Sequence, residues 1–415
     1  MNELHPLSSA HDQPKTSPQS SRWSRRFSGR RLSGRPFSAP VARVGRLAVA
    51  TGALLALGLG TGASAIELDP AAAERLAAAQ LDAQVVTAPM ALGPGMEEWV
   101  AERIKDNAPD EIRLKRLLRE LYENEELNFE YQEGHTATVA ETFETGRYNC
   151  LSFSMLYVAL ARSIDLEAFY LSIRRDQDFR KVGDLVVLTR HITAGYGSNF
   201  TDRTVLEFDV GPEIDYAAAE PISDTEALAL YYSNRGAELL RQSKLEEAQE
   251  NLEIAIALAP EIAQTWVNIG VVHRRLERFE QARVAYERAA ELERNNVAAY
   301  QNLVILLRRQ GMNDAAAELI DFLDRMGNRN PFTYLALGDF SLEDGQLTEA
   351  GRFFRKAHRL ARDEAETHAA LGLWSMLVGK TSRARSWLRS AQEIDPNNSR
   401  TVRLAARLES RTANL

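Results

Sequence analysis

Cysteine is nearly absent from this sequence, because Cys150 is the only one in 415 residues. A single thiol cannot form an internal disulfide, which excludes a disulfide-stapled scaffold. The sequence also contains no Cys-x-x-Cys and no His-x-x-x-His spacing, which argues against a zinc site. We therefore expect no metal and no cofactor, and the sequence raises the question of why one thiol is kept.

Positive charge is concentrated in the first 46 residues. The formal net charge of the chain is −8, and residues 1–46 contain nine Lys or Arg against two acidic residues. Residues 47–65 are uncharged, which leaves a net charge of −15 on residues 66–415. An acidic body argues against non-specific nucleic-acid binding, so we expect no nucleic-acid partner.

One uncharged apolar run, "LAVATGALLALGLGTGASA", follows the basic stretch at residues 47–65. A basic segment, a short apolar core and an Ala-Ser-Ala end are typical of a secretory signal peptide. The core is too short and too rich in Gly and Ala for a comfortable membrane span. We predict that residues 1–65 are a signal peptide with a basic extension and that the protein is periplasmic or secreted. An uncleaved membrane anchor is the alternative.

The middle of the chain combines helical and strand-like patterns. Residues 66–95 are Ala-rich with Pro and Gly near their end, and we predict a linker. Residues 97–128 repeat apolar side chains at three- and four-residue steps, which predicts helices. Two runs rich in β-branched residues, "DLVVLTRHITAGY" and "TVLEFDV", predict two strands, and the polar stretch "AAAEPISDTE" predicts a second linker.

The rest of the chain repeats with a period of 34 residues. The copies start at Ala229, Ala263, Val297, Pro331 and Ala365. Position 8 is Gly in four copies, position 20 is Ala in all five, and position 4 is Tyr, Trp or His, which we expect in the core. This pattern resembles the tetratricopeptide repeat, which implies paired helices that stack into an all-α superhelix. We predict five repeats and a cap helix over residues 229–412.

Two polar positions exceed the needs of packing in the first three repeats. Position 6 is Asn and position 13 is Arg, and seven residues make nearly two helical turns, so each pair shares a face. The residues are Asn234, Asn268, Asn302, Arg241, Arg275 and Arg309. Amides can bond a peptide backbone and arginines can bind carboxylates. We predict that this stripe binds a protein or peptide partner; a merely solvated polar face is the alternative.

Cys150 stands at the start of a helix-like run. Asn149 is the predicted N-cap, and a cysteine in the first turn points its sulfur toward free backbone N–H groups, where the helix dipole favours the thiolate. A thiol nucleophile also needs a base. Five of the seven histidines lie in the export segment or the repeats, which leaves His135 and His191.

A catalytic constellation can be assembled around this thiol. A turn centred on Phe200 would set His191 directly opposite Asp209, where the carboxylate could orient one imidazole nitrogen. We predict Cys150, His191 and Asp209 as the catalytic residues. A buried structural cysteine and a core histidine are the alternative.

These stretches also resemble a known enzyme superfamily. "TATVAETFETGRYNCLSFSMLYVALARSIDLEAFYLSI", "RHITAGY" and "VLEFDV" are similar to transglutaminase-like domains of the papain-like fold group. The resemblance covers roughly residues 97–216, predicts a domain over residues 96–220, and implies an α+β fold with Cys–His–Asp chemistry on Cys150, His191 and Asp209. Asp184 and Asp202 compete for the third role, and Tyr148 or Asn149 is a candidate second oxyanion donor.

The sequence therefore predicts an exported two-domain protein. The resemblance implies a cysteine hydrolase or acyltransferase acting on an amide bond of a peptide or envelope component, with the repeats binding a protein or peptide. The rival hypothesis is a non-enzymatic adaptor that binds partners through both domains. A membrane contact is expected only if the N-terminal segment is uncleaved.

Overall fold

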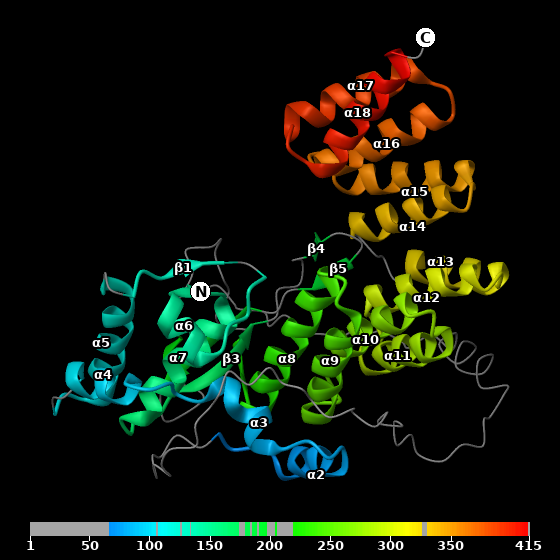
Figure 1. The fold of residues 1–415 in the computed structure, drawn as a ribbon. Coiled ribbons are helices and arrows are strands. Elements are labelled where there is room, and N and C mark those ends of the chain that lie inside the picture. Colours follow the sequence, from blue (N-terminus) through cyan, green and yellow to red (C-terminus); the bar gives the residue numbers. More distant parts are fainter. Residues whose placement is uncertain are drawn as a thin grey trace, which may run out of the picture. The chain divides into compact units, whose positions relative to one another are not determined.

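The computed structural model describes residues 66–104, 107–124, 127–132, 134–173, 179–182, 185–188, 191–196, 204–205, 219–325 and 330–413. The predicted export segment, residues 1–65, lies outside these ranges. Within them, no helix combines the length and hydrophobicity that a membrane span requires. Helices dominate the described chain, and the strands lie between residues 130 and 222 (Figure 1).

Residues 66–95 are not the linker that their composition predicts. They form α2 (Pro70–Ala78), α3 (Ala83–Thr87) and the 3₁₀ helix η1 (Ala88–Met90). Leu76, Val86 and Met90 are buried in the main apolar core. The Arg75 guanidinium donates to the Ala257 carbonyl at 2.6 Å and to the Leu258 carbonyl at 2.7 Å. These buried apolar side chains and long-range hydrogen bonds fix the segment against the first repeat.

The helical part of the middle region surrounds one central helix. It comprises α4 (Met96–Arg103), α5 (Asp110–Glu123), α6 (Val139–Thr145) and α7 (Cys150–Ser163), with the short strands β1 (Glu130–Tyr131) and β2 (Arg147–Tyr148) paired in parallel. Every residue of α7 from Leu151 to Ala161 is buried, so the helix is enclosed on all sides and not on one face alone. The Tyr157 hydroxyl donates to the Leu114 carbonyl of α5 at 2.9 Å.

An antiparallel sheet packs beside α7. Its order is β7 (Thr204–Val205), β6 (His191–Tyr196), β3 (Phe169–Ile173) and β8 (Ala219–Ile222). The run predicted as one strand, "DLVVLTRHITAGY", is divided between β5 (Leu185–Leu188) and β6. β5 pairs with β4 (Phe179–Val182) in a separate hairpin. β8 lies inside the stretch predicted as the second linker. This stretch forms a strand there because its backbone pairs with β3 at the edge of the sheet.

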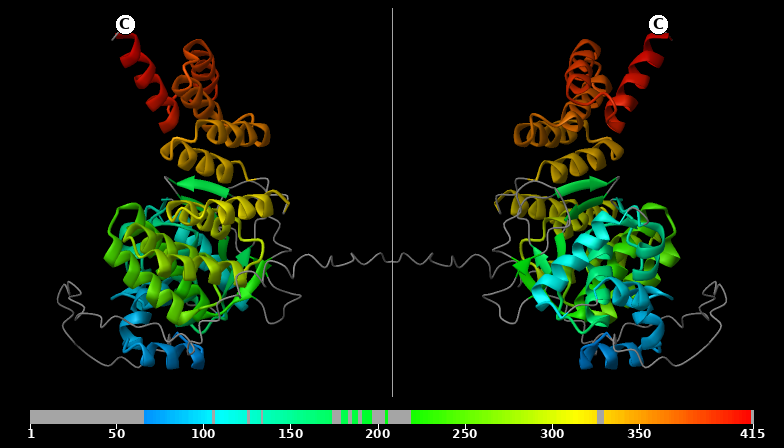
Figure 2. Two further views of the ribbon diagram at one scale, coloured as in Figure 1. Left: turned by 90° about the vertical axis from the view of Figure 1, so that its right-hand side faces the viewer. Right: turned by 90° about the vertical axis from the view of Figure 1, so that its left-hand side faces the viewer.

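Helical hairpins follow in the 34-residue register that the sequence predicts, and successive pairs pack side by side (Figures 1 and 2). The pairs are α8 (Asp224–Arg241) with α9 (Leu245–Leu258), α10 (Ala263–Arg275) with α11 (Phe279–Leu292), α12 (Val297–Arg309) with α13 (Asn313–Arg325), α14 (Pro331–Glu343) with α15 (Leu347–Leu360), and α16 (Ala365–Leu377) with α17 (Thr381–Ile394). The cap helix α18 (Ser399–Ala413) ends the array. Only α8 departs from the predicted starts: it begins five residues before Ala229, where Ser223 caps it.

Close approach explains the small residues of the repeat. A Cβ added at Gly270 would lie 2.4 Å from the ring of Tyr286, sixteen positions later, and Gly338 has the same relation to Phe354. The third repeat carries Val304 at this position and the smaller Ile320 opposite, and both are buried. In the first, second and fourth repeats the first helix therefore meets its partner through a small and a large side chain, whereas Gly372 of the fifth repeat faces Leu404 of α18.

Candidate functional site

Cys150 is the first residue of α7, as the sequence predicts, and is half-buried. Asn149 is confirmed as the N-cap: its Oδ1 accepts from the Ser152 backbone N–H at 2.9 Å, while the Ser152 hydroxyl accepts from the Asn149 N–H at 2.8 Å. This reciprocal capping satisfies two otherwise unpaired backbone donors. The backbone on both sides of Cys150 is thereby fixed.

His191 is the first residue of β6 and lies opposite Ile173 of β3. Ser154, one turn after Cys150, connects the two elements. Its hydroxyl oxygen lies 2.6 Å from the Cys150 carbonyl oxygen and 3.3 Å from that of Ile192. The first turn of α7 therefore packs against the beginning of the strand that carries His191.

The pairing of β6 with β7 has the register that the sequence predicts. Gly195 lies opposite Val205 and Tyr196 opposite Thr204, so each pair of numbers sums to 400. The same register would set His191 opposite position 209. Asp209 itself, and its competitors Asp184 and Asp202, lie outside the described residues. The catalytic roles of Cys150, His191 and Asp209 thus stay a prediction.

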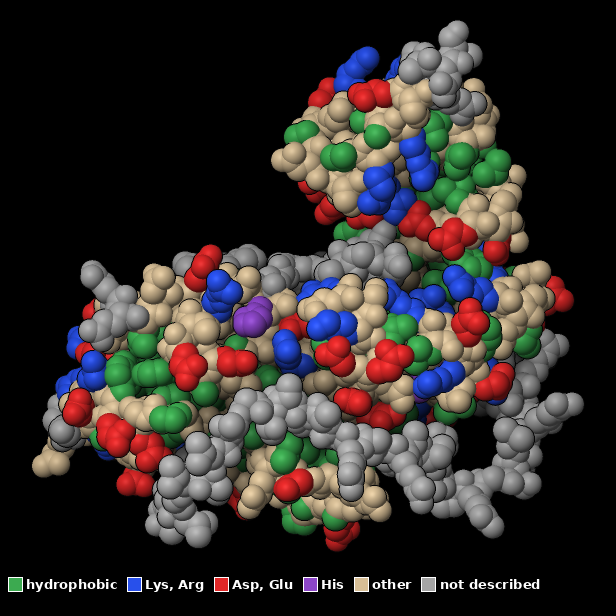
Figure 3. Space-filling view, in the orientation of Figure 1, with side chains coloured by type: hydrophobic (Ala, Val, Ile, Leu, Met, Phe, Trp, Pro, Cys, Tyr) green, Lys and Arg blue, Asp and Glu red, His purple; other side chains and the backbone are tan. Residues whose placement is uncertain are grey.

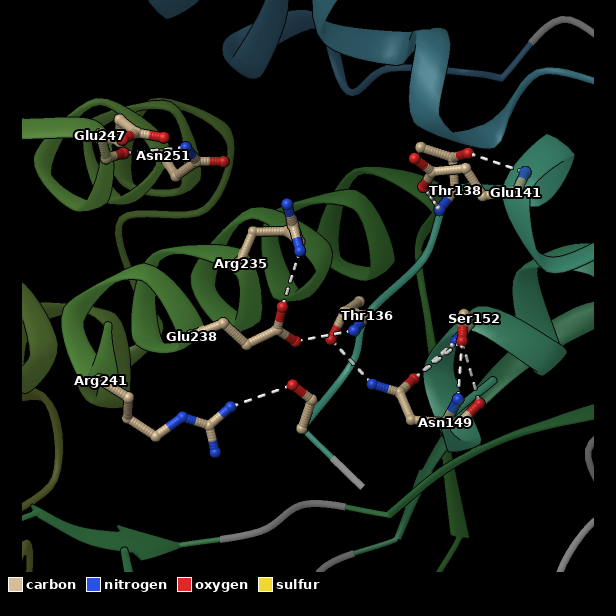
Figure 4. Close-up of polar contacts among 11 residues, drawn as sticks. Thr136, Thr138, Glu141, Asn149, Ser152, Arg235, Glu238, Arg241, Glu247 and Asn251 are labelled. Atoms are coloured by element: carbon tan, nitrogen blue, oxygen red, sulfur yellow. Dashed lines mark hydrogen bonds and ion pairs between the residues drawn. The ribbon is translucent and has the colours of Figure 1, made fainter. Parts of the chain in front are cut away.

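A buried polar network leads from the Asn149 cap to the first repeat (Figure 4). The Asn149 amide Nδ2 donates to the Thr136 hydroxyl at 2.8 Å, and the Thr136 backbone N–H donates to the Glu238 carboxylate of α8 at 2.7 Å. Arg235 pairs with the other carboxylate oxygen at 2.8 Å. Asn149, Thr136 and Glu238 are each less than a tenth exposed.

The predicted Asn and Arg stripe is partly engaged within the chain. Arg241 donates to the Gly134 carbonyl at 3.1 Å, and Arg275 donates to the Leu240 carbonyl at 2.9 Å. Asn268 is buried and accepts from Gln264, and Asn302 donates to the Ala298 carbonyl. The remaining two residues, Asn234 and Arg309, are exposed. Peptide binding by this stripe stays a prediction.

A groove of about 780 Å³ lies at the other end of the repeats, between α14, α16 and α18. Arg400 is part of the groove lining. The Arg400 guanidinium donates to both carboxylate oxygens of Asp339, at 2.6 and 2.5 Å, and to Glu366 at 3.4 Å. Apolar and charged side chains share the remaining lining. They include Leu342, Glu343, Leu373, Leu377, Arg403, Leu404 and Arg407.

The sequence did not reveal this groove, because α18 reads as a solvating cap. Leu404 and Leu408 are instead buried in a core cluster with the fifth repeat, and Arg400 is buried beside Asp339 of the fourth repeat and Glu366 of the fifth. The only available signal was the apolar three- and four-residue spacing within the cap. Charges of both signs are mixed with apolar side chains over the face seen in Figure 3. Among the described residues, no group of three or more His, Cys, Asp or Glu could hold a metal ion.

Comparisons with known proteins support the repeats. The sequence pattern of the tetratricopeptide repeat matches residues 263–296. Human Protein O-mannosyl-transferase TMTC1 is 30% identical over 95 residues, 23% of this chain and 11% of that protein. Tetratricopeptide repeat-containing protein trd-1 of Caenorhabditis elegans is 27% identical over 154 residues, 37% of this chain and 19% of that protein. This chain thus spans a fifth or less of these curated relatives.

Solved structures are similar over part of the chain. The crystal structure of TTC0263, a thermophilic TPR protein of Thermus thermophilus, covers 44% of this chain and 97% of its own, with 18% identity and a TM-score of 0.37. The match of the repeat pattern at residues 263–296 shows that the chain contains tetratricopeptide repeats, a module typical of protein binding.

Proposed function

We propose that residues 96–220 form a transglutaminase-like cysteine hydrolase or acyltransferase domain of the papain-like fold group, and that the repeats deliver or hold its protein substrate. The contact of the Ser154 hydroxyl with the carbonyls of Cys150 and Ile192 carries this proposal, because it brings the helix start and the histidine strand together. The register of β6 and β7 adds support for Asp209 as the third member.

The proposed reaction is acyl transfer from an amide. The Cys150 thiolate attacks the carbonyl carbon, the C–N bond breaks, and His191 protonates the departing amine. The thioester is resolved by water, which gives up a proton to His191, and the C–S bond breaks to release the acid and restore the Cys150 thiolate beside protonated His191. Asp209 would hold the imidazole in the required tautomer. The protein would act after export, on a peptide or envelope component.

Alkylation of the thiol tests this proposal without a known substrate. Cys150 is the only cysteine, so iodoacetamide reports it alone. We expect the wild-type protein to react faster at pH 7 than an unperturbed cysteine, and His191→Ala to lose most of that excess. His135→Ala, the other histidine considered from the sequence, is the matched control. Equal alkylation rates in the wild type and in His191→Ala would contradict the proposed role of His191 as the base for Cys150.

A non-enzymatic adaptor is the second candidate, and the groove at the last two repeats favours it. Three arginines and three acidic side chains line the groove, so its formal charge is balanced; Arg400 pairs with Asp339 and Glu366, and Arg403 and Arg407 lie in the lining together with leucines. These two arginines can bind the carboxylates of a segment that also carries apolar side chains. Peptides of this kind, selected by display, should lose binding to Arg403→Glu with Arg407→Glu.

The Asn and Arg stripe makes a competing prediction for the same peptides. Asn268→Ala with Arg275→Ala should weaken binding if the stripe is the binding surface and leave it unchanged if the groove is. Unchanged binding in both double variants would remove both surfaces as the recognition site.

A further inference from the structure

Glu238 is a buried carboxylate at a repeat position that is otherwise apolar. It occupies position 10 of the first repeat, where the other four repeats carry Val272, Leu306, Phe340 and Trp374. In the fifth repeat the side chain at position 10 contacts the fourth repeat, because the Trp374 indole donates to the Leu347 carbonyl at 2.7 Å. The first repeat has no preceding repeat, and Glu238 meets residues 134–138, here called the strap.

Two side chains of α8 hold the strap by its backbone. Glu238 accepts from the Thr136 N–H, and Arg241 donates to the Gly134 carbonyl. Gly134 has a φ of +74°, and a Cβ there would lie 2.7 Å from the Arg241 guanidinium. The left-handed backbone favours glycine at this point of the strap.

The strap in turn is hydrogen-bonded to the beginning of α7, the helix that starts at Cys150. Its Thr136 hydroxyl accepts from Asn149 Nδ2, which leaves Asn149 Oδ1 facing the Ser152 N–H. An unbroken series of hydrogen bonds thus runs from Glu238 through Thr136 and Asn149 to the first turn of α7 (Figure 4). Each link is buried, where hydrogen bonds are strong and their loss is costly.

Packing alone does not explain this carboxylate. Burying a charge costs free energy that an apolar side chain would not, and replacing buried ionic groups by well-packed apolar ones is often neutral or stabilising. The leucine of the third repeat shows that an apolar residue suits the helix at this position. The first repeat thus departs from the apolar pattern of position 10 at the point where it contacts the region of the proposed active site. Departures of this kind are expected at functional sites.

We propose that Glu238 is a positioning residue for Cys150, acting through Thr136 and the Asn149 cap, so that the first repeat is part of the active-site framework and not a separate binding module. The inference rests on the proposed cysteine chemistry. It assigns Glu238 and Thr136 no contact with substrate. Their effect is to fix the direction of the first turn of α7, and with it the placement of the sulfur among the helix N–H groups.

The pH dependence of Cys150 alkylation tests the inference in the full-length chain. Thr136→Val removes the hydroxyl acceptor while keeping the shape and the backbone N–H. We expect its alkylation rate at pH 7 to fall about fivefold, the effect of losing one buried cap interaction, with the half-maximal rate moved to higher pH. Thr136→Ser restores the acceptor and should stay close to the wild-type profile.

Glu238→Leu, which copies the third repeat, tests the same series of hydrogen bonds from its other end. We expect a lower melting temperature, because the buried Thr136 N–H loses its acceptor, and, well below that temperature, an alkylation profile shifted in the same direction as that of Thr136→Val. Glu238→Gln keeps an acceptor for the Thr136 N–H and should shift the profile less.

The possible failures are distinguishable. A wild-type thiol that reacts like an unperturbed cysteine overturns the proposed function. A perturbed wild-type profile that is unchanged in folded Thr136→Val overturns the inference alone. Should Thr136→Val not fold, an unchanged profile in Glu238→Leu overturns it instead.

Discussion

The first two repeats and the last three share one 34-residue plan, but they depart from it in different ways. Repeats one and two contain a buried carboxylate, Glu238, and two left-handed residues that are not glycine, Ser243 and Glu277. Repeats three to five have apolar side chains and glycines at the same positions and end in a groove against α18. The first repeat, which contacts α7 and β3, carries the buried carboxylate, whereas the last repeats form a groove with the cap helix.

The largest expected effect on stability is at Arg400 of the cap helix, which follows the last repeat. Its side chain is 7% exposed and pairs with Asp339 and Glu366. Arg400→Met should lower the free energy of unfolding by about 2–3 kcal/mol, less than for a fully enclosed pair because Asp339 is partly exposed. Urea unfolding followed by tryptophan fluorescence measures this, since Trp374 and Trp387 lie in the fifth repeat.

Arg403→Met is the matched control, because Arg403 lines the same groove but is exposed. We expect its change in unfolding free energy to stay within about 0.5 kcal/mol. Similar losses in both variants would show that Arg400 does not organise the cap of the array.

A second prediction exchanges a packing pair between the two groups of repeats. Gly270→Val should destabilise the second repeat by about 2 kcal/mol, because the new side chain overlaps the Tyr286 ring. Adding Tyr286→Ile reproduces the Val304 and Ile320 pair of the third repeat and should recover most of that loss. Thermal unfolding of the single and double variants measures the coupling. An additive, unrecovered double variant would mean that the two groups of repeats pack by different rules.

Acid should weaken the second repeat through His273. Burial, and then the nearby Arg278 charge, lower the pKa of His273 from 6.5 to about 4. Between these values the unfolded chain binds the extra proton and the folded chain does not, so stability present above pH 6.5 is lost as the pH falls toward 4. We expect a loss of about 1 kcal/mol, because the ring is only half-buried and the full shift must be discounted for solvent screening.

His273→Leu should remove this part of the pH dependence while leaving the titration of the carboxylates unchanged. Melting temperatures of both proteins from pH 7 to pH 4 give the difference. Parallel curves would contradict the assignment.

The sequence predicted the repeats much better than the site. Spacing alone placed the starts of α10, α12, α14 and α16, because each repeat contacts mainly its neighbours and its pattern is local. The Asn149 cap was predictable for the same reason, since the capping residues lie three positions apart.

Long-range contacts account for what the sequence missed. Glu238 and Thr136 are 102 positions apart, and nothing local to either predicts their contact. The one signal was a glutamate at a repeat position that is otherwise apolar. Composition also misled at residues 66–95, where Ala, Pro and Gly suggested a linker although Leu76, Val86 and Met90 are core residues.

The smallest predicted effect concerns the backbone at position 15, where a left-handed residue follows the end of every first helix of the repeats. The residues are Ser243, Glu277, Gly311, Gly345 and Gly379, with φ between 59° and 80°. A side chain disfavours this conformation, whereas glycine adopts it readily. Glu277→Gly should therefore raise stability by about 0.5 kcal/mol, the relief of strain being partly offset by greater freedom of the unfolded chain.

Gly345→Ala is the reverse exchange and should lower stability by about 1 kcal/mol. No atom lies within 4 Å of a Cβ placed there, so the change tests backbone conformation without a steric clash. Unfolding free energies of the two variants should move in opposite directions. If Glu277→Gly instead destabilises the protein, the Glu277 side chain makes a favourable contact that outweighs its strain, and the early repeats would owe their irregularity to selection for that contact rather than to tolerance of a poor residue.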